Sequence, residues 1–277
     1  MAGSKLVAPV LKWAGGKRQV LKHIKMHVPK SFSVYHEPFL GGGALLFELK
    51  PPEAAVNDIN SELINVYQVI KDSVEELIID LKKHKNEEAY YYRVREQDRD
   101  REQYERLTAI QRASRVIYLN KTCYNGLFRV NKAGEFNTPF GGYARPNIVN
   151  EAVLRAVSDY FNWARITFTS LDFEEALNNV KCGDFVYLDP PYDPVSDTAS
   201  FTGYDRGGFD REEQKRLKRA CDKLHERGVK FILSNSATEF IKDLYKSYKT
   251  VVIKAKRPVN SRADKRGEID ELLVMNY

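Results

Sequence analysis

The stretch Val34-Tyr35-His36-Glu37-Pro38-Phe39-Leu40-Gly41-Gly42-Gly43 decides the fold class of this chain. Val34 to Leu40 reads as a short strand that ends at three glycines, and Ala44 to Leu49 follows as a helix. A second short strand, Ala54-Ala55-Val56, leads into Asn57-Asp58. A strand, a glycine loop, a helix and a second strand with an acidic end are typical of the start of a nucleotide-binding α/β fold.

The same alternation of strands and helices returns after about Asn150. A helical segment is predicted for Arg211 to Arg227. Near the start of the chain, Lys17 to Val28 is amphipathic and stops at Pro29, as a helix should. We therefore predict one doubly wound sheet. Its further strands are expected at Arg165–Leu171, Asp184–Leu188, Val229–Ser234, Val251–Ala255 and Ile269–Asn276.

The middle of the chain has a different character. From about Ser61 to Asn120 it is charged and has apolar residues at helical spacing. Two short runs, Leu127–Asn131 and Glu135–Thr138, flank a connection that contains Gly134, which predicts a β-hairpin. We interpret residues 63–149 as an inserted helical and hairpin domain, and residues 1–62 and 150–277 as one discontinuous domain.

Composition excludes several classes of protein. The chain has 277 residues and a net charge of +6, which favours a polyanionic partner without identifying one. It has no apolar run of membrane-spanning length and no signal-peptide core, so we expect a cytoplasmic protein. Its three cysteines are widely separated and its one helical histidine pair, His23 and His27, has no third ligand nearby, so we expect no disulfide framework and no metal site.

The glycine loop and Asp58 predict a cofactor that carries a nucleoside. Glycines allow the backbone to approach a ligand closely, and Asp58 follows the next strand, where a carboxylate can accept hydrogen bonds from two ribose hydroxyls. Leu46 replaces the third glycine of the dinucleotide fingerprint, so the loop alone leaves NAD and S-adenosylmethionine as alternatives.

A second glycine motif, Trp13-Ala14-Gly15-Gly16-Lys17, is not a phosphate loop. Its first glycine is missing, and Arg18 stands where Ser or Thr should bind magnesium. Lys17 and the indole of Trp13 are suited instead to contacts with a carboxylate and an adenine face.

The segment Asp189-Pro190-Pro191-Tyr192 directly follows the strand that ends at Leu188. The two prolines fix an extended backbone and withhold their N–H groups, which leaves carbonyls and a carboxylate as acceptors. Asp189 and the Pro190 carbonyl are suited to accept the two protons of an exocyclic amino group, while the Tyr192 ring stacks on the heterocycle. The alternative is a rigid turn with a chance aspartate.

Together these motifs make the chain resemble the Dam family of DNA adenine-N6 methyltransferases, including the methylases of GATC restriction systems. The resemblance covers nearly the whole chain, and the order of the motifs is also that of the family. The motifs are Leu11-Lys12-Trp13-Ala14-Gly15-Gly16-Lys17, Glu37-Pro38-Phe39, Asn57-Asp58, Tyr124-Asn125-Gly126-Leu127, Gly134-Glu135-Phe136-Asn137-Thr138-Pro139-Phe140-Gly141 and Asp189-Pro190-Pro191-Tyr192.

The resemblance implies a Rossmann-like methyltransferase sheet that uses S-adenosylmethionine. It implies that Asp189, Pro190, Pro191 and Tyr192 form the catalytic pocket for an adenine flipped out of the duplex, and that transfer is direct, without a covalent intermediate. The positions expected to bind the cofactor are Trp13, Lys17, Glu37, Pro38, Phe39, Gly41, Gly43, Asp58 and Asp189.

The resemblance also implies that the insert reads double-stranded DNA, with GATC as the favoured site and Arg129 suited to a guanine edge. Gly142 departs from the family pattern, which has Arg or Lys there, so Arg145 is a candidate substitute. We expect a monomer in solution. The residues expected to contact DNA are Tyr124, Asn125, Leu127, Arg129, Pro139, Tyr143 and Arg145.

A basic stretch near the C-terminus, residues 249–266, carries a net charge of +6 and is expected to contact phosphates. Two alternatives remain: methyl transfer to RNA adenine or protein glutamine on the same fold, and a DNA-binding module without catalysis. Asp189 and Asp58 argue against the second. The charged residues of the basic stretch are Lys249, Lys254, Lys256, Arg257, Arg262, Asp264, Lys265 and Arg266.

Overall fold

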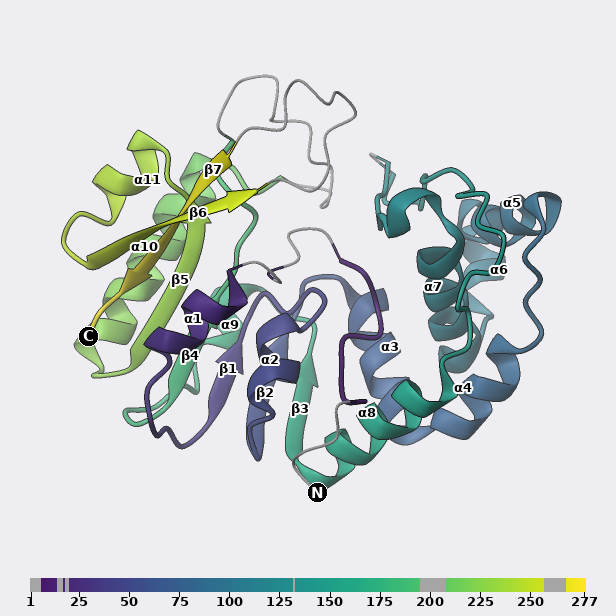
Figure 1. The fold of residues 1–277 in the computed structure, drawn as a ribbon, viewed down its shortest axis with the longest axis horizontal. Coiled ribbons are helices and arrows are strands. Elements are labelled where there is room, and N and C mark those ends of the chain that lie inside the picture. Colours follow the sequence, from purple (N-terminus) through teal and green to yellow (C-terminus); the bar gives the residue numbers. More distant parts are fainter. Residues whose placement is uncertain (1–5, 14–16, 18–19, 132, 195–207, 257–267) are drawn as a thin grey trace.

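The structure is a computed structural model and describes residues 6–13, 17, 20–131, 133–194, 208–256 and 268–277. Within these residues, seven strands form one mixed sheet in the order β3-β2-β1-β4-β5-β7-β6, in which β7 runs antiparallel to the other six (Figure 1). The strands are β1 (Tyr35–Glu37), β2 (Glu53–Asn57), β3 (Arg165–Thr169), β4 (Phe185–Leu188), β5 (Lys230–Ser236), β6 (Lys249–Lys256) and β7 (Glu268–Met275).

Helices alternate with the strands, as the sequence predicts. The helical stretch from Ser61 to Asn120 is also confirmed, as α3 to α7. The helices are α1 (Leu21–His27), α2 (Ala44–Leu49), α3 (Ser61–Asp72), α4 (Val74–Leu81), α5 (Glu88–Glu96), α6 (Arg101–Glu105), α7 (Ala109–Thr122), α8 (Glu151–Trp163), α9 (Phe173–Ala176), α10 (Arg211–Glu226) and α11 (Glu239–Leu244), with 3-10 turns at Gln97–Arg99 and Tyr124–Gly126.

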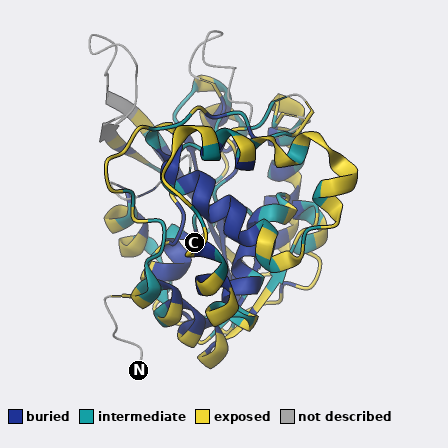
Figure 2. Ribbon diagram, turned by 90° about the vertical axis from the view of Figure 1, so that its right-hand side faces the viewer, coloured by how far each residue is buried: buried dark blue, intermediate teal, exposed yellow. Residues whose placement is uncertain are grey.

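Alternate residues of the strands face two separate cores. On β4, Phe185 and Tyr187 belong to a core that includes α2, α3 and α8, whereas Val186 and Leu188 belong to a core with α9, α10 and α11. All four residues are buried, as expected for a parallel strand covered on both faces. Figure 2 shows the buried segments in the interior and the exposed helix faces outside.

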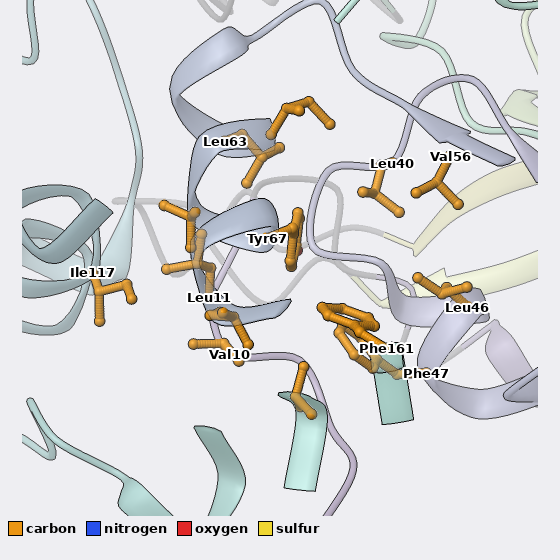
Figure 3. Close-up of a cluster of buried hydrophobic side chains, with 14 of the residues drawn as sticks. Val10, Leu11, Leu40, Leu46, Phe47, Val56, Leu63, Tyr67, Ile117 and Phe161 are labelled. Carbon is orange, nitrogen blue, oxygen red and sulfur yellow. The ribbon is translucent and has the colours of Figure 1, made fainter. Parts of the chain in front are cut away.

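The first of these cores continues from the sheet into the helical region. Leu46 and Phe47 of α2 and Phe161 of α8 belong to the same cluster as Leu63 of α3 and Ile117 of α7 (Figure 3). The predicted domain boundary at residue 63 falls inside α3, so the two parts share a helix and a continuous apolar core.

Three predicted elements differ from the structure. The expected strand Val34–Leu40 is shorter, because Pro38 lacks the N–H that the sheet ladder needs. The helix expected from Lys17 is assigned only from Leu21, with residues 18–19 outside the described part. The expected hairpin is formed only in part: residues 127–131 and 133–138 are antiparallel, but they pair at an isolated bridge between Val130 and Phe136 and not along two strands.

Side chains explain why the hairpin ladder is so short. The Asn131 side-chain oxygen accepts hydrogen bonds from the N–H groups of Ala133 and Glu135, and the Thr138 hydroxyl donates to the Leu127 carbonyl over 2.7 Å. The bonds to Asn131 are local and compete with strand pairing for the N–H groups, whereas the bond from Thr138 joins the two runs by a side chain. The connection is therefore a loop braced by its own side chains.

Candidate functional site

The strand order places two loops beside each other at one edge of the sheet. From β1 the chain continues to β2 and β3 on one side, whereas β4 continues to β5 on the other, so the order reverses between β1 and β4. In open α/β sheets, ligands bind at the carboxyl ends of the strands at such a reversal. Residues 38–43 follow β1 and residues 189–192 follow β4, so both predicted motifs belong to one site.

The glycine loop has a backbone shape that glycine adopts at little cost. Gly41 and Gly43 have φ angles of 49° and 66°. A Cβ atom on Gly41 would lie 2.9 Å from Cδ1 of Trp13, so the indole lies directly against the loop. The Gly41 carbonyl accepts a hydrogen bond from the Tyr67 hydroxyl over 2.9 Å, which ties the loop to α3.

Asp58 is held rigidly beside this loop. Its Oδ2 accepts from the Gly41 N–H and its Oδ1 from the Asn60 N–H, each over 2.9 Å. A carboxylate accepts several hydrogen bonds, so Asp58 has the chemistry to accept hydroxyl donors while its orientation stays fixed.

Trp13 connects the glycine loop with the helical region. Its ring stacks on Phe128, with centroids 4.7 Å apart and an interplanar angle of 22°. The adjacent Lys12 exchanges two backbone hydrogen bonds with the Asn120 side chain of α7, at 2.9 and 2.8 Å. The segment that carries Trp13 is therefore anchored on α7 while it covers the loop.

The residues just before the glycines are fixed by hydrogen bonds and packing; they are Glu37, Pro38 and Phe39. Glu37 is only 2% exposed and accepts a hydrogen bond from the Tyr35 hydroxyl over 2.9 Å. Burial raises the pKa of this carboxyl well above its usual value. The Pro38 carbonyl accepts from the Asn57 side chain over 3.1 Å, and the Phe39 ring packs on Phe173.

Asp189 is oriented by two donors that contact the same oxygen. The Ser234 hydroxyl lies 2.9 Å from Oδ1, and the Lys17 ammonium lies 3.0 Å from it. The Tyr187 hydroxyl lies 3.0 Å from Ser234 Oγ and completes a buried chain of hydroxyls. Among the described residues no donor contacts Oδ2, so that oxygen is free to accept a ligand donor.

Lys17 lies between two carboxylates although it is only 4% exposed. Besides Asp189, its ammonium contacts the Tyr192 hydroxyl and lies 4.0 Å from Oε2 of Glu271. Burial lowers the pKa of Lys17, but attraction to Asp189 and Glu271 outweighs burial, so the pKa is raised overall. Lys17 therefore keeps its positive charge inside the site.

Tyr192 is fixed at its backbone and at its hydroxyl. The Pro191 carbonyl accepts from the Gln214 side chain over 2.8 Å, and the Asp193 N–H donates to Asn235 over 3.0 Å. The hydroxyl donates to Oε2 of Glu271 over 3.1 Å. Burial, with the negative charges of Asp189 and Glu271, raises the pKa of Tyr192 well above its usual value, so the phenol stays protonated.

The residues predicted to contact DNA lie together in the segment 122–145. Hydrogen bonds from Tyr124 N–H to the Pro139 carbonyl and from Gly141 N–H to the Thr122 carbonyl, both 2.8 Å, join its two ends. Asn125 has a φ of 57° and Leu127 is half-buried. The other predicted contacts are exposed: Tyr124, Arg129, Pro139, Tyr143 and Arg145.

Part of the predicted basic stretch can be placed. Lys249 and Lys254 lie on β6, as does the backbone of Lys256. Arg257, Arg262, Asp264, Lys265 and Arg266 lie outside the described residues.

Sequence reasoning missed Ser234 and Glu271. Each is a polar residue next to apolar, buried neighbours, Ser234 directly after Leu233 in β5 and Glu271 directly before Leu272 in β7. Such a position is a usable signal, because a polar group in a buried strand needs a partner. Which partner it has depends on the pairing of distant strands.

Among the described residues there is neither a metal-binding cluster nor a membrane-spanning helix. No group of three or more His, Cys, Asp or Glu side chains there is arranged to hold a metal ion. In the same residues, every helix is too short or too polar to cross a membrane.

Known proteins resemble this chain along most of its length. A family model described as "D12 class N6 adenine-specific DNA methyltransferase" matches residues 13–259. The type II methyltransferase M1.LlaDCHI of Lactococcus lactis subsp. cremoris is 43% identical over 271 residues, which covers 97% of this chain and 95% of the relative. The type II methyltransferase M.MjaIII of Methanocaldococcus jannaschii is 40% identical, with 98% and 99% covered, and the DNA adenine methylase of Escherichia coli K12 is 33% identical, with 96% and 94% covered.

Proposed function

Because this chain belongs to the D12 class of N6 adenine-specific DNA methyltransferases and methylates adenine at specific sites in DNA, we propose that its methyl donor is S-adenosylmethionine. We also propose that it flips the target adenine out of the duplex. The observation that carries the proposal is the arrangement of Asp189: a carboxylate with one oxygen held by Ser234 and Lys17 and the other without a donor among the described residues.

The residues around the glycine loop fit S-adenosylmethionine. Because Gly41 has no side chain, the Trp13 indole packs directly on the loop backbone, and Asp58 offers fixed acceptors for a ribose diol. Trp13 supplies a ring face for adenine. When bound, the cofactor supplies an electrophilic methyl group on a sulfonium.

Asp189 makes the amino group of adenine a better nucleophile. The lone pair of N6 is delocalised into the ring, and hydrogen bonds from N6–H to Asp189 Oδ2 and the Pro190 carbonyl favour the more tetrahedral nitrogen of the transition state. A preorganised bond of this kind is worth about 2.7–4 kcal/mol of barrier. Ser234 and Tyr187 orient the carboxylate, and the Tyr192 ring stacks on the base.

Flipping follows from the position of this site. The side chain of Asp189 is only 21% exposed, so an adenine stacked inside a duplex cannot present its amino group to it. In our proposal the base enters the pocket from the side of the recognition segment, residues 122–145, and engages Asp189 while Lys17 balances the negative charge.

GATC is the proposed target, read by a recognition insert at residues 63–149 that is carried by a catalytic domain of residues 1–62 and 150–277. Arg129 presents an exposed guanidinium, and its Nε donates to Asn137 over 2.8 Å, which aims the group. Gly142 has a φ of 64° and open space where a Cβ would be, so we assign the missing cation of the family pattern to the exposed Arg145.

A transfer assay tests the proposal. The protein is incubated with S-adenosylmethionine labelled in the methyl group and with matched duplexes that contain GATC or a scrambled site, and with RNA and a glutamine-containing protein as alternative acceptors. We expect label on adenine of the GATC duplex alone. Label on RNA or protein, or equal label on both duplexes, would contradict the proposed substrate or site.

A further inference from the structure

Glu271 is an acidic residue in the middle of a strand that neither the sequence motifs nor the family resemblance assigns to a role. It lies on β7, paired with Ser236 of β5 and Ile253 of β6, and the next residues, Leu272 and Leu273, are buried core. Its side chain is 17% exposed. A carboxylate at such a position is costly unless polar partners compensate it.

Its partners are two residues of the proposed methyl-transfer site. Oε2 of Glu271 accepts the hydroxyl of Tyr192 over 3.1 Å and lies 4.0 Å from the ammonium of Lys17. Lys17 also contacts Asp189, at 3.0 Å. The two carboxylates therefore share one buried cation, and Tyr192 is linked to Glu271 by a hydrogen bond.

The hydrogen bond to Glu271 fixes the orientation of the Tyr192 ring, which the backbone contacts alone leave free. Gln214 and Asn235 hold the backbone on either side of Tyr192, but the ring can still rotate about its side-chain torsions. The bond from the hydroxyl to Glu271 anchors the far end of the ring to the sheet. A ring that stacks on a base must keep one plane, and displacement of about 1 Å can cost about 100-fold in rate.

We propose that Glu271 is a positioning residue for methyl transfer, which holds the Tyr192 ring in the plane that receives the target adenine and shares the charge of Lys17 with Asp189. The inference rests on the proposed function of Asp189 and Tyr192. Glu271 acts through Tyr192 and does not touch the reacting atoms.

The test is a double-mutant cycle of Glu271→Ala and Tyr192→Phe, measured as kcat and as KM for S-adenosylmethionine. Each single variant is expected to lose about 10-fold or more in kcat with KM within about 2-fold, because the ring is no longer held. The double variant is expected to lose no more than either single variant. Losses that multiply, or a wild-type kcat for Glu271→Ala, would overturn the inference.

Two further variants keep the outcome clear. Glu271→Gln retains an acceptor for the Tyr192 hydroxyl and is expected to recover most of the kcat lost by Glu271→Ala; if it is as impaired as Glu271→Ala in its folded state, ring positioning is refuted. Asp270→Asn removes the same charge from the exposed neighbour on the same strand and is expected to leave kcat unchanged. A wild-type protein without transfer to adenine would instead refute the proposed function.

Discussion

The site at the sheet edge and the recognition segment, residues 122–145, are built in opposite ways. Around Asp189, residues from β4, β5, β7 and the N-terminal segment converge through buried hydrogen bonds and ion pairs. In the recognition segment, Tyr124, Arg129 and Tyr143 are exposed, and Arg129 contacts only the nearby Asn137 among the described residues. The proposed catalytic centre is thus preorganised by the fold, whereas the side chains proposed to read DNA lie at the surface.

Removing Asp189 should break the first region while leaving the second intact. Asp189→Ala is expected to lower kcat by about 1,000-fold, because the acceptor for the adenine amine is lost, while the Kd for duplex DNA stays within about 2-fold. Single-turnover transfer and fluorescence anisotropy measure the two quantities. Asp189→Asn serves as an isosteric control for folding, and a kcat near wild type in either variant would refute the assigned role.

Removing Arg129 should impair sequence discrimination and leave the rate of methyl transfer intact. Arg129→Ala is expected to cost about 1–3 kcal/mol of discrimination between GATC and a duplex with one guanine replaced, with kcat on a saturating GATC duplex nearly unchanged. The ratio of kcat/KM for the two duplexes checks this. Unchanged discrimination would show that Arg129 does not read a base, and Arg145→Ala is the matched comparison in the same segment.

The helices that carry the recognition segment have their own buried polar cluster, which predicts a pH dependence of stability. His84 stacks on Tyr118 with centroids 4.3 Å apart, contacts Tyr90 and Ser114 at 3.0 Å, and burial lowers its pKa to about 4. Because the pKa is lower folded than unfolded, stability is full above the ordinary pKa of about 6.5 and is lost as pH falls toward 4.

Between pH 7 and 5, this histidine should account for a loss of about 2 kcal/mol in the free energy of unfolding. Urea denaturation of wild type and His84→Gln at both pH values measures the effect, and the variant should show the smaller loss. An equal loss in the two proteins would mean that His84 does not titrate as its burial implies.

Ser234→Ala should give the smallest effect. The hydroxyl contributes one hydrogen bond to the charged Asp189, while Lys17 remains to hold the same oxygen, so kcat is expected to fall by about 10-fold. Ser234→Cys, which retains a weak donor, should fall less. If both variants match wild type in kcat, Asp189 does not depend on Ser234 for its orientation.

Local patterns were enough to predict the elements that carry the motifs. The glycine loop, α2, β2 and the placement of Asp189 directly after β4 follow from short runs whose periodicity and glycines or prolines are decisive. The partners of Asp189 and Tyr192 could not be predicted this way. Ser234 and Glu271 lie 45 and 79 residues further along the chain from them. The pairing of β4 with β5 brings Ser234 to the site, and the pairing of β5 with β7 brings Glu271.

The hairpin shows the opposite error. Two short runs around Gly134 favoured two strands, but the Asn131 side chain bonds the backbone of the connection and the runs pair only at an isolated bridge. The recognition segment is therefore shaped by side chains at single positions, which strand periodicity does not register.

The most direct test of the central claim is a map of N6-methyladenine in the DNA of cells that lack their own adenine methylase and express this chain. We predict methylation of the adenine in GATC throughout the genome with the wild-type chain and none with Asp189→Ala at equal expression. Methylation at another sequence would contradict the proposed site. The absence of N6-methyladenine, or equal methylation by the Asp189→Ala variant, would contradict the account of the catalytic centre.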